Sequence, residues 1–384
     1  MGPLEGIKII EIGGIGPGPF CGMILADMGA DVLRVDRAGG GSPSIVPNLI
    51  LNRGKRSIEV NLKSPEGVDV LLKLCESADA IFEGFRPGVV ERLGISPEEC
   101  MKRNPGLVYG RMTGWGQDGP LAQASGHDIN YISLSGALHA VGRKGERPVP
   151  PLNLVGDFGG GGMFLAFGIV CALLEAKKSG KGQVVDAAMV DGSASLMARF
   201  FTFKYRGKFK EERGSNFLDG AAHFYDTYET RDGKFISIGS IEPQFYKLLI
   251  EKTGVDPDKF AMQMDDTKWP ELTDDLARVF KSKTRDEWCE ILEGTDVCFS
   301  PVLSISEAAE HPHNKARKTF FEIDGLMQPA PAPRFSRTVP EVRRGDKLRC
   351  NAMDVLSDWG FAEDEIIDLK EKGELPVCSV ASKI

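Results

Sequence analysis

Short apolar runs alternate with helical patterns through the first half of the chain. Buried strands are predicted where apolar residues cluster between turn signals, at 7–12, 30–35, 58–62, 80–82, 107–109 and 183–188. Between them, apolar residues follow helical spacing, and Ser64-Pro65-Glu66 and Ser96-Pro97-Glu98-Glu99 are typical helix starts. Strands that alternate with helices predict an α/β fold whose large domain holds a doubly wound, mostly parallel Rossmann-like sheet.

The pattern changes after residue 205. Two strands joined by the turn Arg231-Asp232-Gly233 are predicted at 223–228 and 235–238, and helices should start at Glu242 and Thr284. We expect a large domain of 1–205 with a return segment of about 320–384, a linker of 206–220 and a smaller α/β domain of 221–315. A helix at 192–205 should turn its apolar face to the core, and 354–372 should form one or two amphipathic helices.

Composition narrows the class of protein. Hydrophobic residues make up 42% and charged residues 27% of the 384 residues, as in soluble globular proteins, and the net charge of −8 argues against a nucleic-acid partner. The eight cysteines are scattered and the five histidines include a single close pair, so neither a metal site nor a disulfide framework is expected. The apolar run 163–174 is shorter than the about 20 residues that span a bilayer, so no membrane partner is expected.

The first glycine-rich loop raises a dehydrogenase hypothesis. Gly13-Gly14-Ile15-Gly16-Pro17-Gly18-Pro19 links the first strand to a helix, and Asp36 ends the second strand, as in dinucleotide-binding folds. The fingerprint Gly-x-Gly-x-x-Gly fails, because its last position falls on Pro19 or Cys21, and proline has no N–H for a pyrophosphate. The hypothesis is therefore the weakest of those considered.

A second glycine-rich segment carries candidate proton-transfer groups. His127 opens the motif Gly126-His127-Asp128-Ile129-Asn130-Tyr131, and Asp157 precedes four glycines and the apolar run. Both residues are predicted at or near helix N-termini, a helix being expected over 157–178. The alternatives are an aspartate that only caps its helix and an ordinary polar histidine.

Basic residues cluster in the loops that follow the predicted strands. They are Arg37, Arg53, Lys55, Arg56, Lys63, Arg86 and Arg92. Open α/β sheets bind ligands at the carboxyl ends of their strands, so this set suits a phosphate-rich ligand, although each residue alone could belong to a solvated surface.

Several motifs in order resemble those of the α-methylacyl-CoA racemases, within the family III CoA-transferase fold, over nearly the whole chain. They are the Gly16-Pro17-Gly18-Pro19 loop, Arg34-Val35-Asp36-Arg37, the Gly126–Tyr131 motif, Pro151-Leu152-Asn153-Leu154 with Gly156-Asp157-Phe158-Gly159-Gly160-Gly161, Gly180-Lys181-Gly182-Gln183-Val184, and Ile241-Glu242-Pro243-Gln244-Phe245-Tyr246.

The resemblance implies an interlocked homodimer whose active site lies between the large domain of one chain and the small domain of the other. It implies that His127 and Asp157 are the catalytic bases, with Glu242 hydrogen-bonded to His127. The implied contacts to an acyl-CoA substrate, with CoA as part of the thioester rather than a separate cofactor, come from Arg37, Val60, Asn61, Leu62, Lys63, Gly84, Phe85, Arg86, Arg92, Gly126, His127, Asp128, Ile129, Asn130 and Tyr131. Transferases of this fold are expected to lack the histidine, which favours a racemase.

The residues fit inversion of a carbon next to a thioester. One group removes a proton from one face while a second group delivers a proton to the other, and a histidine and a carboxyl group can each act as acid or base. The enolate would be held by N–H groups at the start of the Asp157 helix, since no metal is expected. The alternatives are a CoA-transferase with Asp157 as nucleophile and a non-catalytic acyl-CoA-binding protein.

The end of the chain bears on location. Ser382-Lys383-Ile384 is close to a Ser-Lys-Leu peroxisomal signal, with isoleucine in the last place. We expect a peroxisomal and also a mitochondrial location in a eukaryote, and a cytoplasmic one in a bacterium.

Overall fold

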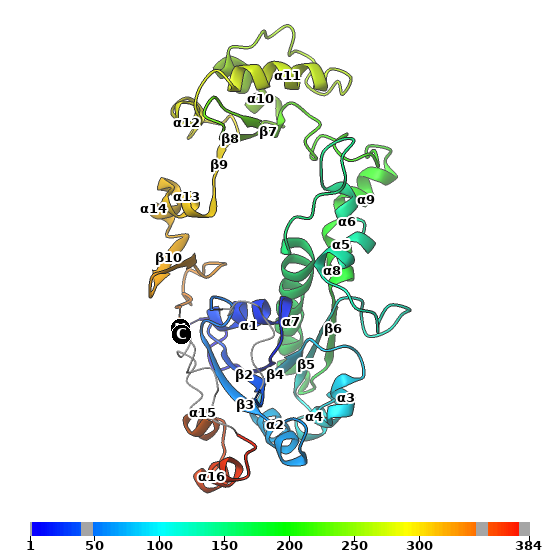
Figure 1. Ribbon diagram of the computed structural model, residues 1–384, viewed down its shortest axis with the longest axis vertical. Coiled ribbons are helices and arrows are strands. Elements are labelled where there is room, and N and C mark those ends of the chain that lie inside the picture. The colour runs from blue at the N-terminus through cyan, green and yellow to red at the C-terminus, as the bar shows by residue number, and fades with distance from the viewer. Residues whose placement is uncertain (1, 40–48, 343–351, 376–384) are drawn as a thin grey trace. The chain divides into compact units, whose positions relative to one another are not determined.

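The chain forms two compact units. The structure, a computed structural model, describes residues 2–39, 49–342 and 352–375 (Figure 1). Met1–Ser135, Leu152–Leu196 and Phe321–Ile384 form the first unit, and Gly136–Pro151 with Met197–Phe320 form the second. Ser382-Lys383-Ile384 lies outside the described residues.

The unit boundaries differ from the predicted domains around residue 197. The predicted helix of 192–205 is two helices, α8 (Met189–Leu196) and α9 (Ala198–Tyr205). The break between them coincides with the boundary between the two units in the sequence, after Leu196. None of the residues of α9 is buried, so the expectation that its apolar face packs in the core is wrong. The predicted linker is an ordered loop, because the Asn216 side chain donates to the carbonyl of Lys210 at 2.9 Å and to Asp219 at 2.8 Å.

The first unit is built on a six-stranded parallel sheet, which confirms the predicted fold class. Its strand order is β3-β2-β1-β4-β5-β6. The strands are β1 (Lys8–Ile12), β2 (Asp31–Arg37), β3 (Lys55–Val60), β4 (Ala80–Glu83), β5 (Val108–Thr113) and β6 (Val184–Ala188). The order reverses between β1 and β4, and in open α/β sheets ligands bind outside the carboxyl ends of the strands at this point.

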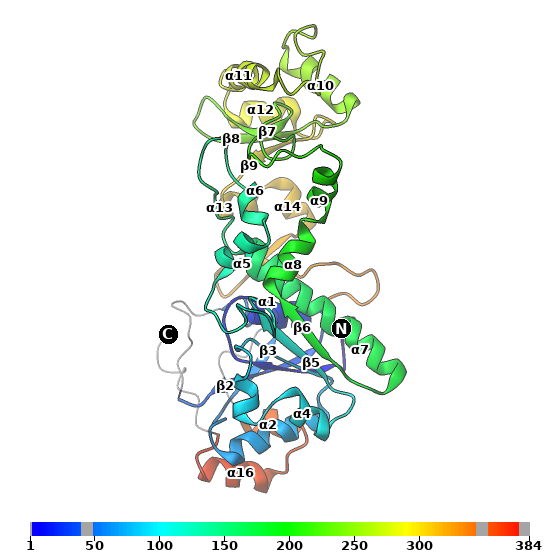
Figure 2. The same ribbon diagram turned by 90° about the vertical axis from the view of Figure 1, so that its right-hand side faces the viewer.

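Helices cover both faces of this sheet. Figure 2 shows α1 (Pro17–Asp27) and α7 (Met163–Ser179) near the sheet. Their side chains form the core on one face together with those of β1, β4 and β5. The core on the other face holds side chains of α2 (Pro65–Ser77), α4 (Pro97–Arg103), α15 (Ala352–Asp358) and α16 (Glu363–Glu371). Shorter helices are α3 (Val89–Leu93) and α5 (Asp128–Leu134). The prediction of one or two amphipathic helices over 354–372 is confirmed, since α15 and α16 occupy this stretch.

The return segment is fixed to the first unit by a buried arginine. A hairpin of β10 (Phe320–Ile323) and β11 (Leu326–Pro329) begins this segment. Arg53 donates to Asp27 at 2.9 and 2.6 Å, and its third nitrogen donates to the Gln328 side chain and the Pro329 carbonyl. A residue near the start of the chain therefore holds one from its last quarter.

The helix that contains Asp157 is longer than its sequence pattern indicated. A π-helical stretch, η1 (Leu154–Gly162), runs directly into α7. Together Leu154–Ser179 span 26 residues and contain an 18-residue window of mean hydropathy 1.7, which is long and apolar enough to cross a membrane by length and composition. The apolar run 163–174 is thus part of a longer apolar helix than the run alone indicated. Leu165 and Ile169 of this helix are fully buried in the core beside the sheet, as in a core helix.

The second unit is a small α/β fold. An antiparallel sheet of β7 (Tyr225–Glu229), β8 (Phe235–Gly239) and β9 (Phe299–Val302) contains the predicted hairpin. It packs with α10 (Pro243–Thr253), α11 (Trp269–Phe280) and α12 (Arg285–Leu292) around an aromatic core that includes Phe224, Trp269, Phe280 and Trp288. The helices α6 (Ala137–Ala140), α13 (Ile305–Glu310) and α14 (Pro312–Arg317) complete the unit.

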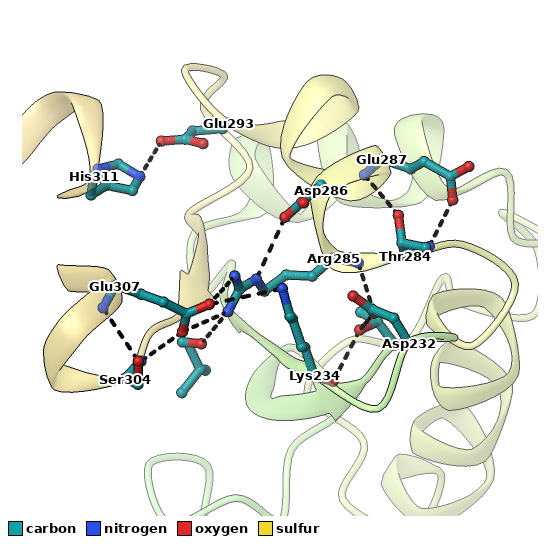
Figure 3. Close-up of polar contacts among 12 residues, drawn as sticks. Asp232, Lys234, Thr284, Arg285, Asp286, Glu287, Glu293, Ser304, Glu307 and His311 are labelled. Carbon is teal, nitrogen blue, oxygen red and sulfur yellow. Dashed lines mark hydrogen bonds and ion pairs between the residues drawn. The ribbon is translucent and has the colours of Figure 1, made fainter.

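A polar cluster fixes the direction in which the chain leaves β9 (Figure 3). Buried Arg285 donates to the Val302 carbonyl at 3.0 Å and to both oxygens of Glu307, at 3.3 and 2.6 Å. Glu307 also accepts from the backbone of Ser304 at 2.9 Å, which caps α13. The predicted capping box at Thr284 is confirmed, with Glu287 as its partner.

Candidate functional site

The residues predicted to contact CoA lie along one edge of the parallel sheet. Arg37 ends β2 and Val60 ends β3, with Asn61, Leu62 and Lys63 in the loop that follows. Gly84, Phe85 and Arg86 follow β4, Arg92 lies in α3, and the segment Gly126–Tyr131 leads into α5 after β5. Because parallel strands end at the same edge, all of these positions belong to the carboxyl edge of the sheet. Their contact with CoA stays a prediction.

His127 stands immediately before α5, as predicted. Its backbone N–H donates to the Asn130 side chain at 3.0 Å, and its carbonyl accepts from the Asn130 N–H at 2.8 Å. These bonds define the start of α5 and hold the backbone of His127, while its side chain is exposed. The imidazole is therefore reachable by a substrate.

Asp157 lies in the first turn of a π-helix rather than at a helix N-cap. Asn153 is the cap residue of η1, so the expected start at 157 is wrong by one turn. The glycines explain the shift, because they let other elements approach too closely for a side chain. A Cβ on Gly161 would lie 2.8 Å from Met189, and one on Gly162 would lie 2.7 Å from the Pro17 carbonyl. Packing against α1 and α8 thus selects the wider helix.

Two side chains hold the turn that carries Asp157. Asp128, directly after His127, accepts the backbone N–H of Asp157 at 2.7 Å. Asn153 donates from its amide to Oδ2 of Asp157 at 3.1 Å. The sequence alone did not identify Asn153 as a site residue. Its spacing of four residues before Asp157 on one helix was the available signal.

The Asp157 carboxyl group is a stronger base than an aspartate in water. Burial raises its pKa, the hydrogen bond from Asn153 lowers it, the Asp128 charge raises it and the His127 charge lowers it, and the net change is upward. Because Asp128 follows His127 directly and accepts the backbone N–H of Asp157, the turns that carry the two predicted bases are neighbours within the first unit.

Tyr131 and Arg86 belong to the same neighbourhood. The Tyr131 hydroxyl donates to the Gly126 carbonyl. Burial raises the pKa of Tyr131, the Asp157 charge raises it further and the Arg86 charge lowers it. Arg86 in turn donates to the Ser125 hydroxyl at 2.7 Å. A cation from the loop after β4 therefore faces the region of the two bases.

The N–H groups expected to hold an enolate are partly occupied. The Asp157 N–H donates to Asp128, and the Phe158 N–H donates to the Asn153 carbonyl at 3.3 Å. These two donors cannot also bind a thioester oxygen, so the expectation is wrong for them. It assumed a helix that begins at Asp157, where the first N–H groups have no partners.

Glu242 lies in the other unit. It is the exposed cap residue of α10, as its Glu-Pro sequence predicted. Its hydrogen bond to His127 stays a prediction.

The structure argues against the dinucleotide hypothesis at Asp36, the acidic residue on which that hypothesis depended. Arg34 donates to Oδ1 of Asp36 at 2.9 and 2.7 Å. A Cβ on Gly13 would lie 2.4 Å from the same oxygen, so the carboxylate is folded back against the loop after β1. An aspartate held in this way is not presented to a ribose hydroxyl. Among the described residues, no group of three or more His, Cys, Asp or Glu side chains could hold a metal ion.

Comparison with known proteins identifies the family of the chain. The model of CoA-transferase family III matches residues 4–346. The chain belongs to this family. It is 46% identical over 370 residues to the alpha-methylacyl-CoA racemase of Mus musculus, covering 95% of this chain and 96% of that protein. It is 45% identical over 369 residues to the alpha-methylacyl-CoA racemase of Homo sapiens, with the same coverage of 95% and 96%.

A solved structure shares the fold over almost the full chain. The crystal structure of a CAIB/BAIF family protein from Brucella suis superimposes with a TM-score of 0.81 at 25% identity. It covers 93% of this chain and 99% of that one. Within family III, the resemblance inferred from the motifs is confirmed by the two racemases.

Proposed function

We propose that this member of CoA-transferase family III is a racemase that inverts the α-carbon of 2-methylacyl-CoA thioesters. The observation that carries the proposal is the presence of two different proton-transfer groups, His127 and Asp157, on neighbouring turns that the hydrogen bond from the Asp157 N–H to Asp128 joins. A transferase with an aspartate nucleophile has no need of the imidazole. The names of the relatives at 45 and 46% identity support the same activity.

The reaction needs a proton to move on each face of one carbon. A base takes the α-proton, the electron pair of the broken C–H bond moves into the thioester, and an enolate forms. The other group, protonated, then delivers its own proton to the opposite face, so that the two groups exchange protonation states. The raised pKa of Asp157 brings its basicity closer to that of an imidazole, whose ordinary pKa is about 6.5. Closer basicities favour transfer in both directions.

The carboxyl edge of the sheet suits the CoA portion. Arg37, Arg86 and Arg92 lie on this edge and can pair with phosphates. CoA is part of the substrate, and the chemistry assigned to His127 and Asp157 requires no separate cofactor.

The proposal includes an interlocked homodimer. Glu242 would then reach His127 from the small unit of the partner and orient its imidazole. Four passages of the chain between the two units, at residues 135–136, 151–152, 196–197 and 320–321, suit chains that thread through one another.

Incubation of one pure enantiomer of a 2-methylacyl-CoA in deuterated water tests the activity. The product should be racemic and should carry deuterium at the α-carbon. Asp157→Asn and His127→Ala should each abolish racemisation. If either variant racemises at the wild-type rate, that residue is not a base. If no deuterium enters with the wild-type protein, the racemase proposal fails, and a CoA-transferase or a non-catalytic acyl-CoA-binding protein remains.

A second candidate follows from the carboxyl group alone. Asp157 could attack a thioester and carry CoA, as in a CoA-transferase. Hydroxylamine would trap such an intermediate, and turnover would depend on an acceptor acid. We expect neither, since the imidazole beside Asp157 provides the second base.

A further inference from the structure

An ion pair is buried beneath the first turn of α1. Nζ of Lys55, on β3, donates to Oε2 of Glu11, on β1, at 2.5 Å and to the carbonyl oxygen of Pro19 at 2.9 Å. The two charged side chains are 1% and 0% exposed. Pro19 lies in the first turn of α1, so the ammonium group ties the sheet to the start of this helix.

The surroundings of the pair are shaped to admit it. A Cβ on Gly22 would lie 1.9 Å from Oε2 of Glu11 and 2.7 Å from Nζ of Lys55. Burial raises the pKa of Glu11 and lowers the pKa of Lys55, and the attraction between them opposes both changes. Oε1 of Glu11 is buried and makes no hydrogen bond within the described part of the chain. Buried pairs of this kind stabilise a fold no better than apolar residues do, so stability alone does not account for the pair.

The turn that the pair holds lies against the turn that carries Asp157. A Cβ on Gly16 would lie 3.0 Å from Oδ2 of Asp157. The rings of Phe20 and Phe158 stack with their centroids 4.6 Å apart. Movement of the start of α1 would therefore be transmitted to Asp157 by direct contact.

We propose that the Lys55–Glu11 pair positions the first turn of α1 and, through it, the Asp157 carboxyl group for proton transfer. The inference rests on the proposed function, in which Asp157 is one of the two bases. Lys55 and Glu11 are positioning residues, because both are buried beneath α1 and act only through it. Without the ammonium group, the Pro19 carbonyl loses its hydrogen-bond donor and the first turn of α1 can move. The Asp157 carboxyl group then no longer packs against a fixed neighbour. Turnover should then fall, while KM should change little because the CoA portion is bound elsewhere on the sheet edge.

The test uses variants that remove or displace the pair. The double variant Lys55→Met with Glu11→Leu leaves no unpaired buried charge, and Gly22→Ala displaces the pair without removing a charge. Lys73→Met is the control. Lys73, on α2, pairs with Glu365, on α16, and both helices contribute to the core on the face of the sheet opposite α1, so this variant removes an ion pair of the same unit away from the start of α1. The measurements on the full chain are kcat and KM for one enantiomer, and backbone hydrogen exchange of residues 16–25.

We expect kcat to fall by about 10- to 100-fold in both the double variant and Gly22→Ala, with faster exchange in 16–25 and a nearly constant KM. Lys73→Met should show neither effect. An unchanged kcat in the double variant overturns the proposal, even if exchange rises. An equal loss of kcat in Lys73→Met also overturns it, because general destabilisation would then explain the result. If the wild-type protein does not racemise, the proposed function fails by itself. Exchange in 16–25 then decides whether the pair holds α1, and an unchanged rate overturns that inference too.

Discussion

Asp157 must be deprotonated to accept a proton from carbon, so its partners should control the acidic limb of the pH–rate profile. Asn153 is the partner that can be removed most cleanly, because it donates one hydrogen bond, at 3.1 Å, to the carboxylate. That bond lowers the pKa of Asp157 against the effect of burial. In Asn153→Ala the pKa should rise further, and the acidic limb of kcat/KM should move to higher pH. Activity below the limb should fall by roughly tenfold for each unit of displacement.

Ser133→Ala is the control for this variant. Ser133 is exposed on α5, and its hydroxyl donates to the Ile129 carbonyl at 2.6 Å. Its pH profile should match that of the wild type. A limb that stays in place in Asn153→Ala would show that the limb reports a group other than Asp157.

Glu83 gives a second pH dependence, in stability rather than rate. The pKa of Glu83 is raised to about 7, mainly by burial and to a smaller extent by the Glu91 charge, against the hydrogen bond from the Phe85 N–H at 2.6 Å and the charge of Arg111. The folded chain thus holds a proton that the unfolded chain releases near pH 4.5. As pH rises from about 4.5 to 7, this group lowers the free energy of unfolding by about 3 kcal/mol, at roughly 1.4 kcal/mol per unit.

Glu83→Gln should remove this dependence. The stability of the wild type, measured by urea unfolding, should fall relative to that of the variant between pH 5 and pH 7.5, by an amount on the order of 3 kcal/mol. Above this range the difference should be constant. Parallel curves across the whole range would mean that Glu83 ionises normally in the folded chain.

At the scale of elements, the glycines of η1 allow its contact with α8. A Cβ on Gly160 would lie 2.7 Å from the backbone nitrogen of Ser193, and one on Gly192 would lie 1.9 Å from the carbonyl oxygen of Gly160. In an ordinary helix, Gly→Ala stabilises by up to about 1 kcal/mol. Here the backbone atoms leave no room, so Gly160→Ala should instead destabilise by about 1–3 kcal/mol and lower kcat, because Asp157 lies in the same helix.

Gly106→Ala provides the comparison. Its Cβ would meet only the Asn104 side chain at 3.4 Å and a carbonyl at 3.9 Å, and it lies outside the helices. Gly160→Ala should unfold at a lower temperature and have a lower kcat than Gly106→Ala. A Gly160→Ala protein as stable and active as Gly106→Ala would show that η1 and α8 can move apart without consequence.

Periodicity could predict most elements, but not how the Asp157 helix begins. The strands and the helix starts at Pro65, Pro97 and Thr284 depend on local apolar patterns and caps, which are legible in the sequence. The widened turn at Asp157 depends on the approach of α1 and α8, which come from distant parts of the chain. The glycines indicated that another segment approaches this helix closely, but not which segment. The residue types and motifs of His127 and Asp157 identified them in the sequence as candidate bases. The hydrogen bond from Asn153 to Asp157 depends on how the helix begins, so the sequence did not identify it.

At the scale of the whole molecule, the sequence predicted two domains but not every stretch that belongs to each. Residues 136–151 join the second unit although they lie between His127 and Asp157 in the sequence, which both belong to the first unit. Local sequence patterns do not indicate with which of the two cores a loop will pack. The Arg53 contacts with Gln328 and Pro329 are equally invisible to periodicity, since 275 positions separate the side chains of Arg53 and Gln328.

The passages between the units lead to a prediction about assembly. If two chains are interlocked, as proposed, they cannot separate without at least one of them unfolding in part. A side-by-side dimer has no such barrier. The protein should therefore run at twice the chain mass of 41.8 kDa, and a mixture of isotope-labelled and unlabelled dimers should contain almost no mixed dimer after a day. After joint unfolding in urea and refolding, mixed dimers should reach half of the total. Native mass spectrometry distinguishes the three masses. Rapid mixing without denaturant, or a monomeric mass with full racemase activity, would contradict the interlocked arrangement and with it the supply of Glu242 from a partner chain.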